Sequence, residues 1–278
     1  MSEKATLVVD GQEVELPIIT GTEAERSIDV TQLRNRTGLT VYDPSLGNTA
    51  ACQSEITFVD GEKGILRYRG IPIEEFTDTP NFVEVAWLLI FGDLPKREDL
   101  AQFREQLTAN ELLHEGLRHQ FQHIPVEAPP MAILSAMLSN MACFYPGFLS
   151  LDDPDTLTEA AARLISKVRT IAAFSYRRSQ GLPVVYPDPS LRYCANLLHM
   201  MFSIPYQQYV VTPEIEDALN LIFILHADHE QNCSTSTVRV VGSSRANLFA
   251  SCAAGVSALW GPLHGGANVE VLDMLQRI

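Results

Sequence analysis

The sequence contains no uninterrupted apolar run that approaches the roughly 18 residues of a membrane-spanning helix. Its first residues lead directly into a strand pattern and lack the basic and apolar stretches of a secretory signal peptide. The five cysteines are far apart and form no C-x-x-C pair, so the sequence predicts neither a disulfide framework nor a zinc ribbon. We therefore expect a protein of the reducing cytoplasm that is neither secreted nor inserted into a membrane.

Positive charge is also scarce, because 20 Lys and Arg residues face 34 Asp and Glu residues and leave a net charge of −14. No block of Lys and Arg is present, which excludes nucleic acid as the expected partner. Glycine-rich Rossmann and P-loop motifs are absent as well. What the sequence does have is 278 residues, 46% of them hydrophobic, which is enough for a sizeable core in one large domain or two modest ones.

The N-terminal part predicts two β-hairpins. Residues 5–9 alternate and pair with residues 13–18 across Asp10 and Gly11, and residues 55–59 pair with residues 65–68 across a turn that ends at Gly64. From Pro80 onward the apolar spacing becomes helical. Helices are expected over residues 81–91, 95–108, 130–145, 155–180, 191–201 and 246–260, from residue 213 with Thr212 as N-cap, and from residue 265 to the end.

Residues 215–226 are apolar almost all round, and a surface helix does not tolerate that pattern. We therefore expect this helix in the middle of a large helical core. The chain halts at residue 278 inside an amphipathic pattern with no cap or polar tail, so we expect the C-terminal part of the fold to be missing.

The first candidate site is the polar run H-A-D-H-E-Q-N over residues 226–232, at the end of that apolar helix. Polar groups drawn into a core must be satisfied, so the run is either a structural network or the floor of a pocket. His226 and His229 share a helix face, which permits a metal site. The H-E-x-x-H spacing and a third ligand are lacking, so we expect no metal.

The second candidate is His264, which stands between Gly261-Pro262 and the two glycines that open the last helix. Glycines let a ligand approach the backbone, and a helix N-terminus disfavours the protonated imidazole. A neutral imidazole N–H beside a carbonyl can stabilise an enolate. The alternative is a loop histidine that satisfies a turn.

Two other groups of residues favour structural roles. Arg67, Arg69, Arg177 and Arg178 are expected to be solvated rather than to bind anions. The methionines on helical apolar faces, at positions 131, 137, 141, 200 and 201, indicate core or subunit interface rather than a cofactor site.

Three stretches resemble motifs of the citrate synthase family, in the family's order. They are residues 54–61 (S-E-I-T-F-V-D-G) continuing through residues 64–73 (G-I-L-R-Y-R-G-I-P-I), residues 226–237, and residues 261–268 (G-P-L-H-G-G-A-N). The resemblance covers essentially the whole chain and is closest to the bacterial type with an extra N-terminal β segment. Members of the family are longer than this chain.

The resemblance implies a mainly α fold in which a small β-hairpin-rich segment, residues 1–75, precedes the first part of a large helical domain, residues 76–278. It implies condensation of acetyl-CoA with oxaloacetate to citrate and CoA in the tricarboxylic acid cycle, an acyltransferase reaction. Small molecules are then the substrates, no cofactor is bound, and the protein is a homodimer or homohexamer.

By the same resemblance, His264 matches the histidine that hydrogen-bonds the acetyl carbonyl as its enol forms, and His229 and Asn232 fall in the oxaloacetate-binding motif. The second catalytic histidine, the aspartate base and the substrate-binding arginines of the family follow the point at which this chain ends. We therefore expect the chain alone to be inactive.

Regulated members of this bacterial type bind NADH at a separate site, whose pattern Tyr145, Arg163 and Lys167 match. Ala109 and Asn110 stand where an arginine and a histidine are usual, and Tyr206 replaces a cysteine. These departures weaken the case for NADH inhibition.

Two alternatives to citrate synthase stay open. A 2-methylcitrate synthase would use propionyl-CoA, and one methylene changes binding by only about 1–3 kcal/mol. A non-catalytic truncated paralogue would keep the core for oligomerisation without the base.

Overall fold

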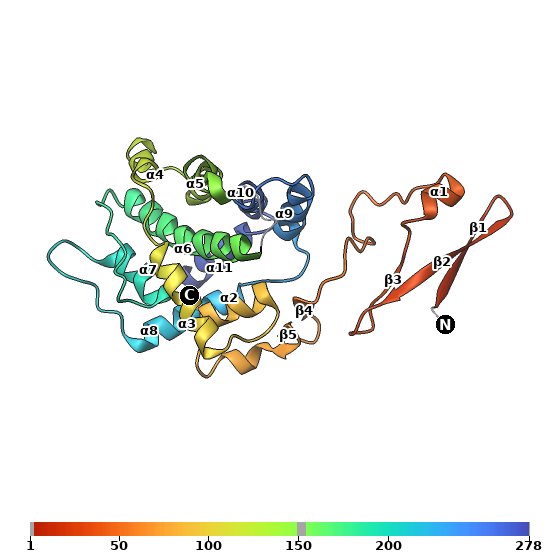
Figure 1. The fold of residues 1–278 in the computed structure, drawn as a ribbon, viewed down its shortest axis with the longest axis horizontal. Coiled ribbons are helices and arrows are strands. Elements are labelled where there is room, and N and C mark those ends of the chain that lie inside the picture. The colour runs from red at the N-terminus through yellow and green to blue at the C-terminus, as the bar shows by residue number, and fades with distance from the viewer. Residues whose placement is uncertain (1–2, 149–153, 278) are drawn as a thin grey trace. The chain divides into compact units, whose positions relative to one another are not determined.

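The computed structural model describes residues 3–148 and 154–277, and it divides the chain into two units, Met1–Glu55 and Ile56–Ile278 (Figure 1). The second hairpin of the sequence thus belongs to the same unit as the helices. The predicted division into residues 1–75 and 76–278 stays a prediction.

The N-terminal unit is a small antiparallel sheet with one short helix. Strands β1 (Lys4–Val9), β2 (Gln12–Thr20) and β3 (Arg26–Ile28) lie in the order β1-β2-β3, and α1 (Leu33–Thr37) follows. Asp10 and Gly11 both have positive φ, 50° and 80°, as the tight turn between Val9 and Gln12 requires. The first predicted hairpin is therefore confirmed. Its buried apolar core consists of Val14, Leu16 and Leu33.

The second unit begins with another three-stranded sheet, in the order β4-β5-β6. Strand β4 (Thr57–Asp60) pairs antiparallel with β5 (Ile65–Tyr68), which pairs with β6 (Ile71–Pro72). The second predicted hairpin is confirmed. In this sheet β4 is an edge strand, so alternate N–H groups along it face away from β5.

Helices make up most of the rest of this unit (Figure 1). They are α2 (Phe82–Phe91), α3 (Arg97–Ala109), α4 (Glu115–Gln120), α5 (Pro130–Phe144), α6 (Pro154–Ser179), α7 (Tyr193–Phe202), α8 (Pro213–Leu225), α9 (Cys233–Ser243), α10 (Leu248–Leu259) and α11 (Gly266–Arg277), with short 3₁₀ turns η1 (Ile73–Phe76), η2 (Phe121–His123) and η3 (Pro146–Phe148). Within the described parts of the chain, none of the helices is long and apolar enough to cross a membrane.

All eight predicted helices are present, with ends that differ by one or two residues; residue 278 lies outside the described residues. Local chemistry explains several ends. Thr212 Oγ1 accepts the Ile215 N–H as the predicted N-cap of α8, and Gly92 closes α2 with φ 100°. The short α1 and α4 and the whole of α9 were not predicted.

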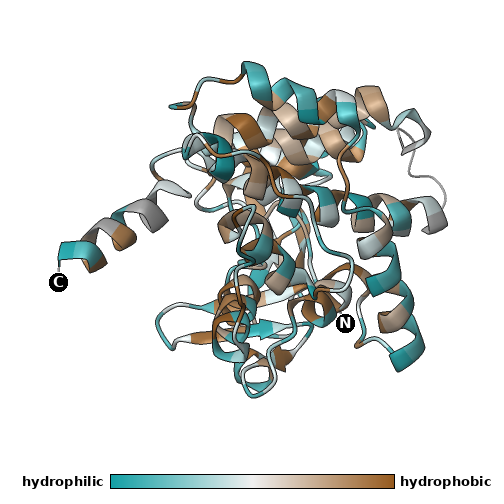
Figure 2. Cartoon of the chain, turned by 90° about the vertical axis from the view of Figure 1, so that its left-hand side faces the viewer, coloured by the Kyte–Doolittle hydropathy of each residue, from teal (hydrophilic) through white to brown (hydrophobic). Residues whose placement is uncertain are grey.

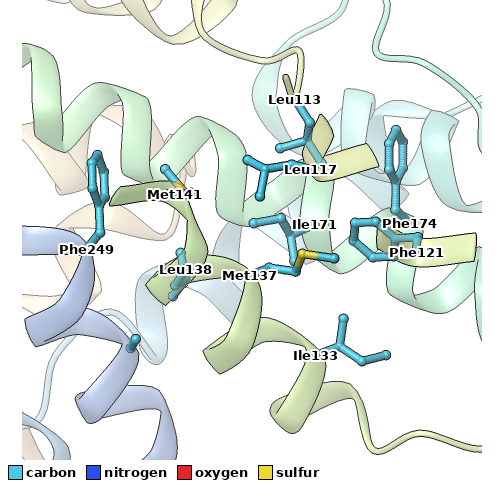
Figure 3. Packing of buried hydrophobic residues seen from close by; sticks show 11 residues of the cluster. Leu113, Leu117, Phe121, Ile133, Met137, Leu138, Met141, Ile171, Phe174 and Phe249 are labelled. Atoms are coloured by element: carbon cyan, nitrogen blue, oxygen red, sulfur yellow. The ribbon is translucent and has the colours of Figure 1, made fainter. Parts of the chain in front are cut away.

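The main core lies where α5 packs against α10 and α6 (Figure 3). Met137 and Met141 of α5 and Phe249 of α10 are almost inaccessible to solvent. Burial of Met137, Met141 and Met200 confirms the core assignment of these methionines. The remaining buried members of this cluster come mainly from α4, α5 and α6: Leu113, Leu117, Phe121, Ile133, Leu138, Ile171, Phe174 and Ala253.

The expectation that residues 215–226 lie in the middle of the core is wrong. Only Glu216, Asn220 and Ile224 of α8 are buried, whereas Ile222 is 51% exposed. The reason is that α8 packs on one side, against α2, α7 and η1, and the rest of its apolar surface remains uncovered. Helix α11 also stands off from the other helices (Figure 2). Its apolar side chains, such as Leu272, are exposed.

The expectation that the arginines are solvated is wrong for Arg177, whose side chain is 1% exposed. Its guanidinium donates to the carbonyls of Pro183, Met201 and Ser203, so it connects the end of α6 to the end of α7. Arg69 is half-buried and donates to the Leu89 carbonyl in the last turn of α2. Both serve as donors to main-chain carbonyls at helix ends.

Candidate active site

The loop between α8 and α9 carries the first group of candidate residues. His226 closes α8, and its Nδ1 lies 2.8 Å from the Ile222 carbonyl oxygen one turn earlier. The His226 and His229 rings lie edge to face with centroids 6.4 Å apart, and both side chains are exposed. The loop therefore presents His229 to solvent rather than burying it in a structural network.

Asn232 is the N-cap of α9 and holds the far end of this loop. Its Oδ1 accepts the Thr235 N–H at 2.8 Å and the Ser234 hydroxyl at 2.7 Å. The side-chain oxygen of Asn232 is thus committed to the helix, whereas its NH₂ group carries two further hydrogen-bond donors.

His264, in the turn after α10, lies beside the start of α9 as well. The turn after α10 is closed by hydrogen bonds from the His264 N–H to the Gly261 carbonyl at 3.0 Å and from the Gly265 N–H to the Leu259 carbonyl at 2.9 Å. A Cβ at position 265 would collide with the Leu259 carbonyl oxygen, so this turn requires glycine. The sequence predicted that the glycines after His264 let a ligand approach the backbone closely. In the structure, the Leu259 carbonyl of the same chain occupies the space beside Gly265.

The imidazole of His264 contacts Ser234 at the start of α9, with Nε2 3.1 Å from Oγ. Helix α9 can come this close because it packs tightly on α10 at Gly255, where a Cβ would lie 2.6 Å from Val238 Cγ2. The structure therefore joins His264, Ser234 and Asn232 in one hydrogen-bonded chain. His229 lies three residues before Asn232 on the same loop.

The proton of Ser234 decides which nitrogen of His264 carries hydrogen. When the hydroxyl donates to Asn232, its oxygen accepts from His264 and the ring hydrogen lies on Nε2. When the hydroxyl turns toward Nε2, a neutral ring carries its hydrogen on Nδ1, where a ligand can receive it. Two tautomers of His264 are thus linked to one hydroxyl rotation.

No group of three or more His, Cys, Asp or Glu side chains within residues 3–148 and 154–277 is arranged to hold a metal ion.

The three residues that match the NADH pattern, Tyr145, Arg163 and Lys167, lie together where the end of α5 meets α6. The Arg163 guanidinium carbon lies 4.8 Å and the Lys167 Nζ 4.9 Å from the centroid of the Tyr145 ring. Lys167 Nζ also donates to the carbonyls of Asn110 and Leu112, at 2.9 and 2.5 Å. Burial lowers the pKa of the Lys167 ammonium to about 8, and the nearby Arg163 charge acts in the same direction. The NADH role of these three residues stays a prediction.

Ser234 and Glu230 lie in the polar stretch that the sequence singled out, but sequence reasoning assigned neither of them a contact. The helix that carries Ser234 had one local signal, because asparagine at position 232 is a good N-cap residue. The run C-S-T-S-T-V that follows is rich in poor helix formers, so the helix was not predicted. Glu230 carried no local signal, because its partner is 171 residues away in the chain.

The fold and the site together define a class: a mainly α-helical protein in which a histidine loop and a glycine-bounded histidine turn meet at the start of one helix. Comparison with known proteins gives the family. The family model "Citrate synthase, C-terminal domain" matches residues 45–278. This chain therefore belongs to the citrate synthase family.

Among characterised relatives, Citrate synthase 1 of Mycobacterium tuberculosis is 47% identical over 276 residues, which are 99% of this chain and 64% of that protein. The chain thus spans about 64% of the length of the curated relatives it matches. The fold matches the crystal structure of citrate synthase from Pyrobaculum aerophilum, with a TM-score of 0.73 and 30% identity over 96% of this chain and 62% of that one.

Two further solved structures agree. Citrate synthase from Thermotoga maritima gives a TM-score of 0.72 at 30% identity, over 86% of this chain and 61% of that one. The ternary complex of carboxymethyl coenzyme A and oxaloacetate with citrate synthase from Thermoplasma acidophilum gives 0.74 at 29% identity, over 80% of this chain and 57% of that one.

Proposed function

We propose that this chain carries part of the active site of a citrate synthase, an acyltransferase that condenses acetyl-CoA with oxaloacetate to citrate and CoA in the tricarboxylic acid cycle. The observation that carries the proposal is 47% identity to a citrate synthase over 99% of the chain, with His264 and Asn232 joined through Ser234. The cytoplasm is the compartment we expect for it.

His264 is the group we assign to the acetyl carbonyl. Removal of a methyl proton from acetyl-CoA places negative charge on the thioester oxygen, and a positioned N–H donor stabilises that charge. The hydroxyl of Ser234 supports this role by turning toward Nε2, because the ring hydrogen then lies on Nδ1 and can be donated. Ser234 is thus a positioning residue for His264.

His229 and Asn232 are the groups we assign to oxaloacetate. The exposed imidazole of His229 and the NH₂ group of Asn232 are both donors on one loop, and oxaloacetate presents carbonyl and carboxylate oxygens as acceptors. A dianionic substrate needs cations as well, and we propose that these and the carboxylate base belong to the part of the family fold that this chain does not span.

The test is an assay of CoA thiol release from acetyl-CoA and oxaloacetate. We expect no turnover by residues 1–278 alone and turnover when a second polypeptide supplies the remaining part of the family fold. Turnover by the chain alone would contradict the missing base and would direct the search to Asp228, Glu230 and Glu270. No turnover under either condition would favour a non-catalytic paralogue.

The same assay separates the close alternative. Repeating it with propionyl-CoA measures the preference for the acyl group, and a higher kcat/KM for propionyl-CoA would reassign the enzyme as a 2-methylcitrate synthase.

We also propose that the protein acts as a homo-oligomer, a homodimer or homohexamer. Support comes from uncovered apolar surface: none of the residues of α9 is buried, and Val240 on this helix is 71% exposed. Light scattering at micromolar concentration that shows only monomer would contradict this proposal.

A further inference from the structure

The segment of residues 54–73 resembles a family motif as closely as the histidine motifs do, yet none of its side chains enters the proposed chemistry. It forms the β4-β5-β6 sheet and the turn η1. A side-chain hydrogen bond connects the edge strand of this sheet to the candidate active site: the Val59 N–H donates to Oε1 of Glu230 at 2.7 Å. Glu230 follows His229 directly in the sequence.

The donor of this bond, the Val59 N–H, lies on the outer edge of the sheet. In the β4–β5 ladder Val59 stands opposite Leu66, and the Arg69 N–H bonds the Ile56 carbonyl at the strand end. Because hydrogen-bonded pairs alternate with non-bonded ones in an antiparallel ladder, the Val59 N–H points away from β5. The carboxylate of Glu230 thus accepts an edge N–H that the sheet itself does not use.

The acceptor residue has an unusual backbone conformation. Glu230 has φ 60°, the left-handed region that residues other than glycine, asparagine and aspartate seldom occupy. Its N–H lies 3.3 Å from Oδ2 of Asp228, so both its backbone and its side chain are tied down. These two contacts bracket His229, which lies between Asp228 and Glu230.

A second contact fixes the start of the same loop to the same sheet. The hydroxyl of Tyr68, at the end of β5, donates to the Ile224 carbonyl at 2.7 Å, and the Asp228 N–H lies 3.5 Å from that hydroxyl oxygen. Tyr68 is completely buried, so this anchor cannot shift without opening the cluster around it. Glu230 then holds the far side of the loop to β4.

We propose that Glu230 is a positioning residue for His229: by accepting the Val59 N–H it holds the histidine loop on the edge of β4, so that the imidazole faces the substrate in a fixed direction. The proposal takes oxaloacetate as the substrate and in this respect rests on the proposed function. The anchoring of the loop does not depend on it.

The experiment compares three variants of the 278-residue chain with the wild type. Glu230→Ala removes the acceptor, Glu230→Gln keeps an amide oxygen in its place without the charge, and Gln231→Ala is the matched control at the next, exposed position of the loop. Amide hydrogen exchange at Val59 and the ring signals of His229, both followed by NMR, report the anchor and the imidazole. Titration with oxaloacetate reports its consequence for binding.

For Glu230→Ala we expect exchange at Val59 to become about tenfold faster, the His229 ring signals to move, and the Kd for oxaloacetate to rise about tenfold, the size of one lost hydrogen bond. Glu230→Gln and Gln231→Ala should resemble the wild type in all three. Unchanged Val59 exchange and His229 signals in Glu230→Ala would overturn the proposal, as would a Glu230→Gln variant that behaves like Glu230→Ala.

Two safeguards keep the outcomes separate. If Glu230→Ala does not fold, Glu230→Gly replaces it, because glycine accepts the left-handed backbone while still lacking the carboxylate. If the wild-type chain does not bind oxaloacetate by itself, the titration is repeated with the second polypeptide that supplies the remaining part of the family fold, and failure to bind there overturns the substrate assignment. The exchange of Val59 and the His229 signals still decide whether Glu230 positions the loop.

Discussion

The α5–α6–α10 core and the candidate active site lie in one unit of the chain but hold their residues in place by different means. In the core, side chains such as Met141 and Phe249 are fixed by nearly complete burial. In the site, Asn232, Ser234 and His264 are fixed by hydrogen bonds, and α9, which carries one of them, has no buried residue. Free energy of unfolding should therefore depend on the core, and function on the site.

The largest expected effect is on the core. Phe249→Ala should lower the free energy of unfolding by about 3–5 kcal/mol, because it leaves a cavity where α10 meets α5. Urea denaturation measures this loss. Leu263→Ala, one residue before His264, is the control, since that side chain is 101% exposed and its removal should change stability by less than about 0.5 kcal/mol. Equal losses in the two variants would break the comparison.

A second test concerns a charge inside the packed region. The Lys167 side chain is 2% exposed, and its pKa falls from 10.5 in the unfolded chain to about 8 in the folded one. Below pH 8 both states hold the proton, and burial of the ammonium costs stability. From pH 8 to 10.5 only the unfolded state holds it, so rising pH stabilises the fold by about 1.4 kcal/mol per unit.

This slope is isolated by comparing the wild type with Lys167→Met between pH 7.5 and 10. The wild type should gain stability relative to the variant as pH rises through about 8. Other groups that titrate there, such as the half-buried Cys252 thiol, contribute equally to both proteins and cancel. Parallel pH profiles for the two proteins would show that the ammonium is not destabilised by burial.

The third prediction is a loss of activity without a loss of stability, the opposite of the effect expected for Phe249→Ala. His264→Ala should lower kcat by more than about a hundredfold, because it removes one preorganised donor to a developing oxyanion. The variant is measured in the polypeptide, or the pair of polypeptides, that turns over acetyl-CoA. Unfolding by urea should be nearly unchanged, because His264 is only part-buried. A variant with near-normal kcat would remove the assigned role.

A smaller effect is expected at His229. Its replacement by alanine should raise the KM for oxaloacetate about tenfold and leave the KM for acetyl-CoA nearly unchanged, because the imidazole is assigned to the first substrate only. Steady-state kinetics with each substrate varied in turn measures both values, and single-turnover data check that KM tracks binding. Equal changes in the two would count against the assignment.

The contrast between core and site also explains what the sequence could predict. Elements with local signals were predicted: the Asp10-Gly11 hairpin, the Thr212 cap and the Gly92 stop are each set by one or two residues. Burial of α8 was predicted wrongly, because the apolar composition of a helix does not say which of its sides has a neighbour.

The candidate site shows the same limit. Motif resemblance pointed to His229, Asn232 and His264, and the structure places Asn232 and His264 on one hydrogen-bonded chain. The residues that connect them were not predictable, since Ser234 meets His264 across 30 positions and Glu230 meets Val59 across 171. Such partners are set by tertiary packing, here by the close contact of α9 with α10 at Gly255.

The smallest expected effect is at Asn232, and it tests the contrast between core and site most sharply. This residue contributes both to stability, as the N-cap of α9, and to the hydrogen bonds of the candidate active site. Asn232→Ala removes the cap of α9 and should cost about 1 kcal/mol of stability. It also frees the Ser234 hydroxyl, whose proton then has His264 Nε2 as its remaining acceptor. The ring hydrogen of His264 should therefore shift from Nε2 to Nδ1, which ¹⁵N chemical shifts of the two ring nitrogens report directly.

Asn232→Asp is the matched control, because aspartate caps a helix as well as asparagine does and still accepts the hydroxyl proton. It should keep both the stability and the tautomer of the wild type, while Ser234→Ala, which leaves the cap of α9 intact, should lose the tautomer preference without the loss of stability. If Asn232→Ala lowers stability but leaves the His264 ring nitrogens unchanged, then Asn232 acts on the helix alone, and the hydrogen-bonded chain does not set the proton on His264.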